Sequence, residues 1–183
     1  MSVRAILLSS AVLLVHASAW AWDLRVHGTV TEYLTGEAIT NATVQVYKDG
    51  VKQFCAPSGS FGHYEFKLDN GARYVLRFSA PGHQAKCFSV DTHGGSWEGE
   101  GGTKDVFVGM TLFEKIEGLD LSYFDLPMGM AHFEPLTGLL TWDQDYDGRI
   151  RAEVRAIMDE YERRMSASAQ ARVPGREIAI LRR

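Results

Sequence analysis

Four short segments between residues 24 and 79 alternate apolar and polar side chains. A spacing of two residues is typical of a β-strand that buries one face and exposes the other to water. The inward positions of this pattern are Leu24, Val26, Gly28 and Val30, then Ala42, Val44 and Val46, then Tyr64, Phe66 and Leu68, and finally Tyr74, Leu76 and Phe78. The turn sequences LTGE, KDG, PSGSFG and LDNG separate the segments. Several short strands at this spacing predict an all-β sandwich or barrel.

A glycine-rich stretch, HGGSWEGEGGTK at residues 93–104, follows this region. It lacks the spacing of a phosphate-binding loop and is typical of a flexible surface loop. Residues 105–146 then return to strand patterns. The run DVFVGMTLFE, with every second residue apolar, predicts one further strand of the sheet, and MAHFEPLTGLLTW predicts two short strands around a turn at residues 135–138.

The last predicted element is an amphipathic helix over residues 147–171. Its apolar residues recur at spacings of three and four, the period of one helical face: Ile150, Val154, Ile157, Met158 and Tyr161. The helix is expected to end before Pro174 and Gly175, and residues 172–183 are either a short strand or a loose tail. The predicted fold class is therefore mainly β, a β-sandwich with a C-terminal helix.

Composition and charge narrow the possible functions only slightly. The chain has 183 residues, of which 45% are hydrophobic and 23% charged, values typical of a folded domain rather than a disordered chain. A formal net charge of −4 provides no basic surface, which argues against nucleic acid as a partner.

The first 21 residues are interpreted as a signal peptide. One arginine precedes the apolar run AILLSSAVLLVHASA, and cleavage sites follow at Ala19 or Ala21. The alternative is an uncleaved membrane anchor, but the run is shorter than the roughly 20 residues that a span needs. The expected location is therefore the periplasm or the extracellular space, with no stable membrane span.

Residues 22–92 resemble the carboxypeptidase regulatory-like domain. The matching motifs are G-x-V at Gly28 and Val30, the T-G turn at Thr35 and Gly36, A-x-V-x-V at 42–46, G-x-Y-x-F at 62–66, and Y-x-L at 74–76 ahead of Pro81 and Gly82. The resemblance implies a prealbumin-like or immunoglobulin-like β-sandwich, in a small stand-alone exported bacterial protein. It also implies a non-catalytic accessory or binding module.

The two cysteines, Cys55 and Cys87, are predicted to form a disulfide bond. Export places them in an oxidising compartment, where an even number of cysteines suggests a bridge. Each is one residue out of phase with its apolar neighbours, so both are expected to point away from the core. The alternative is two separate buried thiols, since sequence spacing alone cannot establish a pairing.

Asp143, Asp145 and Asp147, with Gly148, match the start of a calcium-binding loop. A bidentate glutamate is required at its twelfth position, but Val154 stands there, and the nearest carboxylate, Glu153, is one residue early. The favoured interpretation is that Asp145 or Asp147 caps the helix by accepting backbone N–H groups. Calcium binding through residues 143–154 is the less favoured alternative.

No catalytic residue is predicted, and no cofactor. The spacings of zinc peptidases and serine hydrolases are absent from the sequence. Trp97, in the glycine-rich stretch, is the one exposed aromatic residue that is a candidate contact for a sugar. The sequence thus predicts a binding or structural module of the cell envelope whose partner is an envelope protein or a glycan. A carbohydrate-binding module is the alternative.

Overall fold

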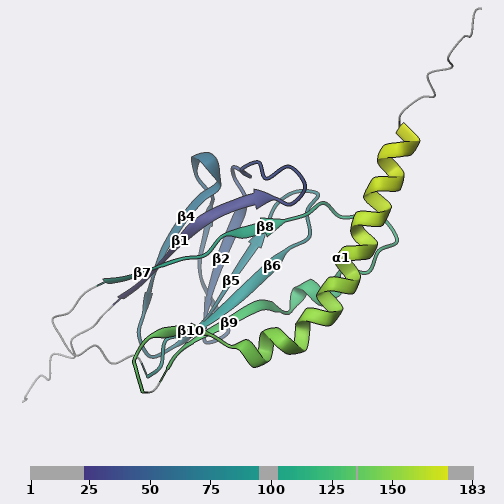
Figure 1. Ribbon diagram of the computed structural model, residues 1–183. Coiled ribbons are helices and arrows are strands. Elements are labelled where there is room, and N and C mark those ends of the chain that lie inside the picture. Colours follow the sequence, from purple (N-terminus) through teal and green to yellow (C-terminus); the bar gives the residue numbers. More distant parts are fainter. Residues whose placement is uncertain (1–22, 95–102, 135, 173–183) are drawn as a thin grey trace, which may run out of the picture.

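The computed structural model describes residues 23–94, 103–134 and 136–172 of the 183-residue chain. Two β-sheets pack face to face, and a single long helix, α1 (Gln144–Arg172), lies along one end of the sandwich (Figure 1). This architecture confirms the predicted fold class. The predicted signal peptide, Trp97 and most of the C-terminal tail lie outside the described residues.

The described residues form ten strands and two short 3-10 helices. The strands are β1 (Asp23–Glu32), β2 (Thr43–Lys48), β3 (Val51–Pro57), β4 (His63–Asp69), β5 (Arg73–Ser79), β6 (Lys86–Asp91), β7 (Thr103–Phe107), β8 (Met110–Leu112), β9 (Pro127–Phe133) and β10 (Leu140–Trp142). The 3-10 helices are η1 (Ser60–Gly62) and η2 (Ser122–Asp125).

One sheet has the order β4-β1-β7, with β8 paired to β1 beyond the end of β7, and the other has the order β10-β9-β6-β5-β2-β3. The pairs β1–β7, β1–β8 and β6–β9 are parallel, and the other pairs are antiparallel. Both sheets thus combine strands from before and after the glycine-rich stretch. The predicted hairpin is confirmed, since β9 and β10 pair antiparallel around the turn.

The prediction of a single strand in the run DVFVGMTLFE, residues 105–114, is wrong, because the chain there forms two strands, β7 and β8, separated at Val108 and Gly109. The division lies directly beside Gly28 of β1. A Cβ atom at Gly28 would lie 2.0 Å from the carbonyl oxygen of Val108, so this approach requires a residue without a side chain. The Tyr64 hydroxyl donates a hydrogen bond to the same oxygen at 2.6 Å. Gly28 therefore allows the chain at Val108 to approach β1 closely at the break between β7 and β8, which run in the same direction along β1.

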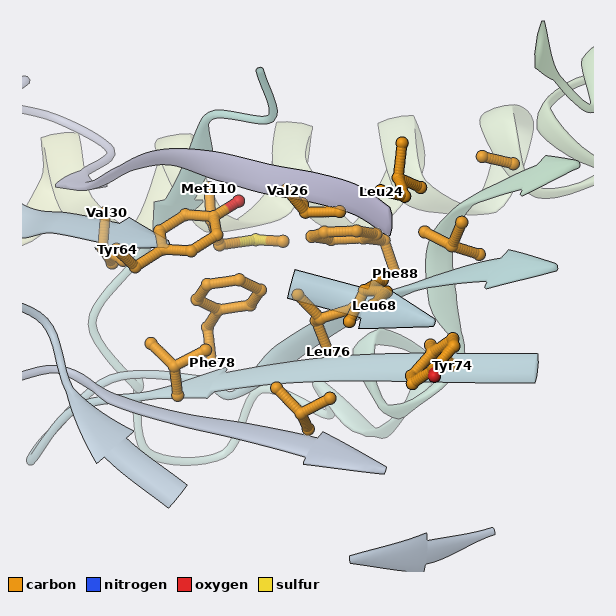
Figure 2. Close-up of a cluster of buried hydrophobic side chains, with 14 of the residues drawn as sticks. Leu24, Val26, Val30, Tyr64, Leu68, Tyr74, Leu76, Phe78, Phe88 and Met110 are labelled. Atoms are coloured by element: carbon orange, nitrogen blue, oxygen red, sulfur yellow. The ribbon is translucent and has the colours of Figure 1, made fainter. Parts of the chain in front are cut away.

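The core between the sheets consists of the inward residues that the alternation predicts. Phe78 lies at its centre, with the Tyr64 ring 4.8 Å away edge-on and the Phe88 ring 5.8 Å away in a stacked arrangement (Figure 2). Val26, Val30, Val44, Val46 and Leu76 are fully buried around these rings. Burial raises the pKa of the Tyr64 phenol well above its ordinary value, which reflects how little water reaches this layer.

A second apolar cluster attaches α1 to the sandwich. Tyr161 of the helix is 0% exposed, and its ring lies 5.0 Å from that of Phe113 and 6.2 Å from that of Tyr33. Leu121 and Phe124, around η2, complete the buried part of this cluster. The helical face predicted from the three- and four-residue spacing is the face that packs here. A second core of this kind explains why the helix has a fixed place against the end of the sandwich.

Candidate functional site

An open cleft lies where α1 crosses the end of the sandwich, and we call it the helix cleft. It has a volume of about 340 Å³. It is lined by Tyr33, Lys86, Phe124, Met128, Asp147, Ile150, Arg151, Val154 and Met158. A second cavity, also of about 340 Å³, shares Lys86, Met128 and Asp147 with it and reaches between the sheets to Phe88 and Trp142. Most of these lining side chains are apolar, so the charged residues stand out.

Lys86 is the central charged residue of the helix cleft. It is the first residue of β6 and pairs with Phe78 of β5, so strand alternation directs its side chain inward, on the same side as Phe88. The ammonium group donates a hydrogen bond to the carbonyl oxygen of Thr111 at 2.8 Å. It also lies 5.3 Å from the ring centroid of Phe113 and 5.5 Å from that of Phe124. A lysine is thus held in the cleft against two aromatic rings that also contact each other, with centroids 4.8 Å apart.

Burial lowers the pKa of Lys86 to about 8, because the charged form loses hydration that the protein replaces only in part. Cation–π contacts and one carbonyl acceptor offset some of that loss. No ion pair joins Lys86 to a carboxylate anywhere in the described parts of the chain. At neutral pH the group is still mainly protonated, so the cleft carries a half-buried positive charge that no carboxylate of the described residues pairs with.

Two other charged residues line the cleft, both from the first part of α1. Asp147 is half-buried and Arg151 is exposed at its rim. Lys86 and Arg151 are positive and Asp147 is negative, so the residues that line the cleft carry one positive charge in excess. Tyr33 closes the opposite side, where its hydroxyl donates a hydrogen bond to Glu162 at 2.5 Å. The helix therefore supplies both an apolar wall and part of the charge.

Sequence reasoning did not identify Lys86 as a site residue. The signal was present, because Lys86, Phe88 and Val90 share one phase of the alternation, and the last two point into the core. A lysine in the inward phase of a strand is unusual, since lysine is rarely buried unless it is paired. Its burial depends on η2 and α1, which are distant in sequence.

The predicted Cys55–Cys87 disulfide bond is not formed, and both residues are free cysteines. Cys55 is exposed on the edge strand β3, whereas Cys87 lies on the outer face of β6 and is covered by η2. The Cys87 thiol donates a weak hydrogen bond to the carbonyl oxygen of Asp125 at 3.6 Å, and burial raises its pKa. The expectation that both side chains point away from the central core is correct, but two strands, β2 and β5, lie between them.

The helix cap is Asp143, not Asp145 or Asp147 as predicted. Asp143 precedes the first helical residue, Gln144, and its carboxylate accepts a hydrogen bond from the backbone N–H of Tyr146 at 2.8 Å. Asp145 and Asp147 instead lie in the first turn, where their negative charge is favourable. Two positions along a helix differ by about 200° in direction, so these two carboxylates diverge. Within the described ranges, no three His, Cys, Asp or Glu side chains are placed to hold a metal ion.

A comparison with protein families identifies the first part of the sandwich, β1 to β6. Residues 25–96 match the carboxypeptidase regulatory-like domain, so this part of the chain is a domain of that family. A comparison of the sequence with curated proteins found no match. Among the described residues, no helix has both the length and the apolar character that crossing a membrane requires.

Solved structures show distant likeness to about half of the chain. Hydroxyquinol 1,2-dioxygenase from Pseudomonas putida DLL-E4 is 9% identical, with 51% of this chain and 57% of that chain covered and a TM-score of 0.37. The Bacillus anthracis TIE protein is 16% identical, with 51% and 17% covered and a TM-score of 0.39. A putative membrane-associated protein of unknown function from Bacteroides fragilis NCTC 9343 is 19% identical, with 54% and 30% covered and a TM-score of 0.37. The chain thus spans less than two thirds of each of these proteins.

Proposed function

We propose that this protein is an exported, non-catalytic binding module whose ligand site is the helix cleft. The observation that carries the proposal is the position of Lys86, which is half-buried and makes no ion pair among the described residues, in a cleft that is otherwise mainly apolar. Ligand sites in proteins are typically concave and apolar, with a small number of polar groups that fix the orientation of the ligand. The volume of about 340 Å³ lies at the lower end of the range for such sites.

A purely structural role accounts less well for Lys86. Burying a charged group without an anion costs free energy, and an apolar side chain of similar length would fill the same space without that cost. Charged groups retained in such places are frequent at functional sites. The lysine is therefore better explained by a ligand that interacts with it than by packing.

A binding role fits the cleft better than catalysis. Proton transfer needs an acid or base within hydrogen-bond reach of the reacting group, usually with a second group that orients it. The direct contacts of the Lys86 ammonium among the described residues are a main-chain carbonyl and two phenylalanine rings, and no hydrogen bond or ion pair joins it to Asp147, the carboxylate that lines the same cleft. The proposed location is the periplasm or the extracellular space, after removal of about the first 20 residues. Mass spectrometry of the protein from its native compartment tests that step, and an intact Met1 would contradict it.

The binding proposal is tested with a neutral fluorescent probe, N-phenyl-1-naphthylamine. The wild-type protein should bind it saturably, because its aromatic rings match the apolar lining. Val154→Trp should abolish this binding by filling the cleft, since Val154 lines the wall formed by α1. Ala156→Trp is the matched control, because Ala156 is exposed and lies about 200° away around the same helix. Equal binding by both variants would overturn the proposal.

A further inference from the structure

We propose that the natural ligand of the helix cleft is a monoanion with an unbranched apolar tail, of the chemical class of a medium-chain carboxylate. This inference rests on the proposed binding function and adds the chemistry of the ligand. The anionic head would pair with the Lys86 ammonium at the bottom of the cleft. The tail would lie along the apolar wall formed by Met128, Ile150 and Val154.

The hydrogen-bonding capacity of Lys86 supports an anionic head. An ammonium group has three N–H donors. In the part of the chain that the structure describes, one acceptor is found, the carbonyl oxygen of Thr111. A carboxylate can accept the remaining donors with both of its oxygens, and such charge-assisted hydrogen bonds are about twice as strong as neutral ones. A neutral head such as an alcohol offers a single oxygen and no charge.

The charge balance of the cleft supports one negative charge rather than two or none. Lys86 and Arg151 are opposed by Asp147 alone, which leaves one positive charge for the ligand to neutralise. Asp147 also lines the second cavity beside Lys86. A dianion such as a phosphate monoester would leave the cleft with one negative charge in excess, and a cationic head would meet two like charges.

The lining beyond Lys86 supports an apolar tail. Met128 and Phe124 approach from the sandwich side and Val154 and Met158 from the helix. Methionine side chains adapt to tails of different shape because they are flexible and polarisable. Each methylene group transferred from water to such a surface contributes about 0.8 kcal/mol, so a tail of several carbons supplies most of the affinity and the head supplies the selectivity.

The experiment measures displacement of N-phenyl-1-naphthylamine by three compounds with the same ten-carbon tail: sodium decanoate, 1-decanol and decylamine. The two ionic compounds are used below their micelle concentrations and the alcohol below its solubility limit. In the wild-type protein at pH 7, decanoate should compete at least tenfold better than decylamine and better than decanol. Lys86→Met should weaken decanoate at least tenfold and leave decanol unchanged, because the stem is kept and the charge removed. Lys52→Met, on the exposed strand β3, is the matched control and should change nothing.

The outcomes separate the two proposals. Absence of probe binding to the wild-type protein, or binding that Val154→Trp leaves intact, contradicts the binding function itself. Binding of the probe with equal competition by all three compounds contradicts the anionic ligand alone. The comparison of the three compounds uses the wild-type protein, so it decides the question even where Lys86→Met fails to fold.

Discussion

Cys55 and Cys87 lie three strands apart in a single row across the six-stranded sheet. The register pairs Cys55 with Gln45, Gln45 with Arg77, and Arg77 with Cys87. Three steps between neighbouring strands amount to roughly 14 Å, about twice the largest Cα separation that a disulfide bond spans. The two thiols therefore cannot join without unfolding the sheet.

We expect the two thiols to react with iodoacetamide at very different rates. Cys55 is exposed and should be modified quickly, whereas Cys87 is 3% exposed and its raised pKa reduces the reactive thiolate, so it should react only after unfolding. Mass mapping of peptides from native and urea-treated protein, both without reductant, measures this. A protein in which neither thiol reacts until reductant is added would refute the arrangement.

Asp143→Ala should lower the free energy of unfolding by about 0.5–2 kcal/mol, because the mutation removes the acceptor for the Tyr146 N–H at the start of α1. Asp145→Ala is the control, since it removes a favourable first-turn charge but no capping hydrogen bond, and it should cost less. Urea unfolding followed by circular dichroism gives both values. A larger loss of stability for Asp145→Ala than for Asp143→Ala would show that Asp143 is not the capping residue.

Calcium should not change the melting temperature. Asp145 and Asp147 belong to the first turn of a helix, which cannot also wrap around an ion as a calcium loop does. Thermal melting of the wild-type protein and of the double mutant Asp143→Ala with Asp145→Ala, in millimolar calcium and in chelator, measures this. A rise of several degrees that the double mutant loses would establish a calcium site, because ligands that bind only the native state stabilise it.

Lys86 should make the protein more stable as the pH rises from about 8 toward 10. The pKa is about 8 in the folded state and near 10.5 in the unfolded chain, so over this interval the unfolded state binds more protons. Stability then increases with pH, by up to about 3 kcal/mol for a shift of this size. Below pH 8 both states are charged and the contribution is constant.

The measurement is urea unfolding of wild type and Lys86→Met at intervals from pH 7 to pH 10. The variant should be the more stable protein at pH 7, and the difference should shrink as the pH rises. Titration of tyrosines such as Tyr64 affects both proteins alike and cancels in the difference. A difference that stays constant over the whole interval would show that Lys86 is not desolvated.

Gly28→Ala should destabilise the sandwich by about 1–3 kcal/mol or more, as expected for overpacking at a closely packed site. The new methyl group would meet the Val108 carbonyl oxygen at 2.0 Å, and that oxygen is held by the Tyr64 hydroxyl. Gly59→Ala is the control, because the nearest atom to a Cβ there is 3.7 Å away. Denaturant midpoints of the two variants give the comparison, and similar midpoints would show that the chain at Val108 can move aside.

Local periodicity explains what the sequence predicted well. The alternation at Val44 and Val46 reports a strand with one buried face, and the spacing of Ile150, Val154 and Tyr161 reports one face of a helix. Both patterns arise because burial repeats with the geometry of the element itself. The matching motifs at residues 24–92 added the family of the sandwich, and one of them, Gly28-x-Val30, corresponds to a physical requirement for a residue without a side chain.

Contacts between segments that are distant in the sequence determined the features that the sequence did not predict. The order of strands separates Cys55 from Cys87, and nothing in the spacing of two cysteines encodes how many strands lie between them. Likewise, Lys86 is half-buried because η2 and α1, up to about 70 residues away in the sequence, cover the end of the sandwich where β6 begins. The sequence by itself determined the elements and their buried faces, since these depend on neighbouring residues. The tertiary structure determined the cleft and its charge, because they depend on which elements meet.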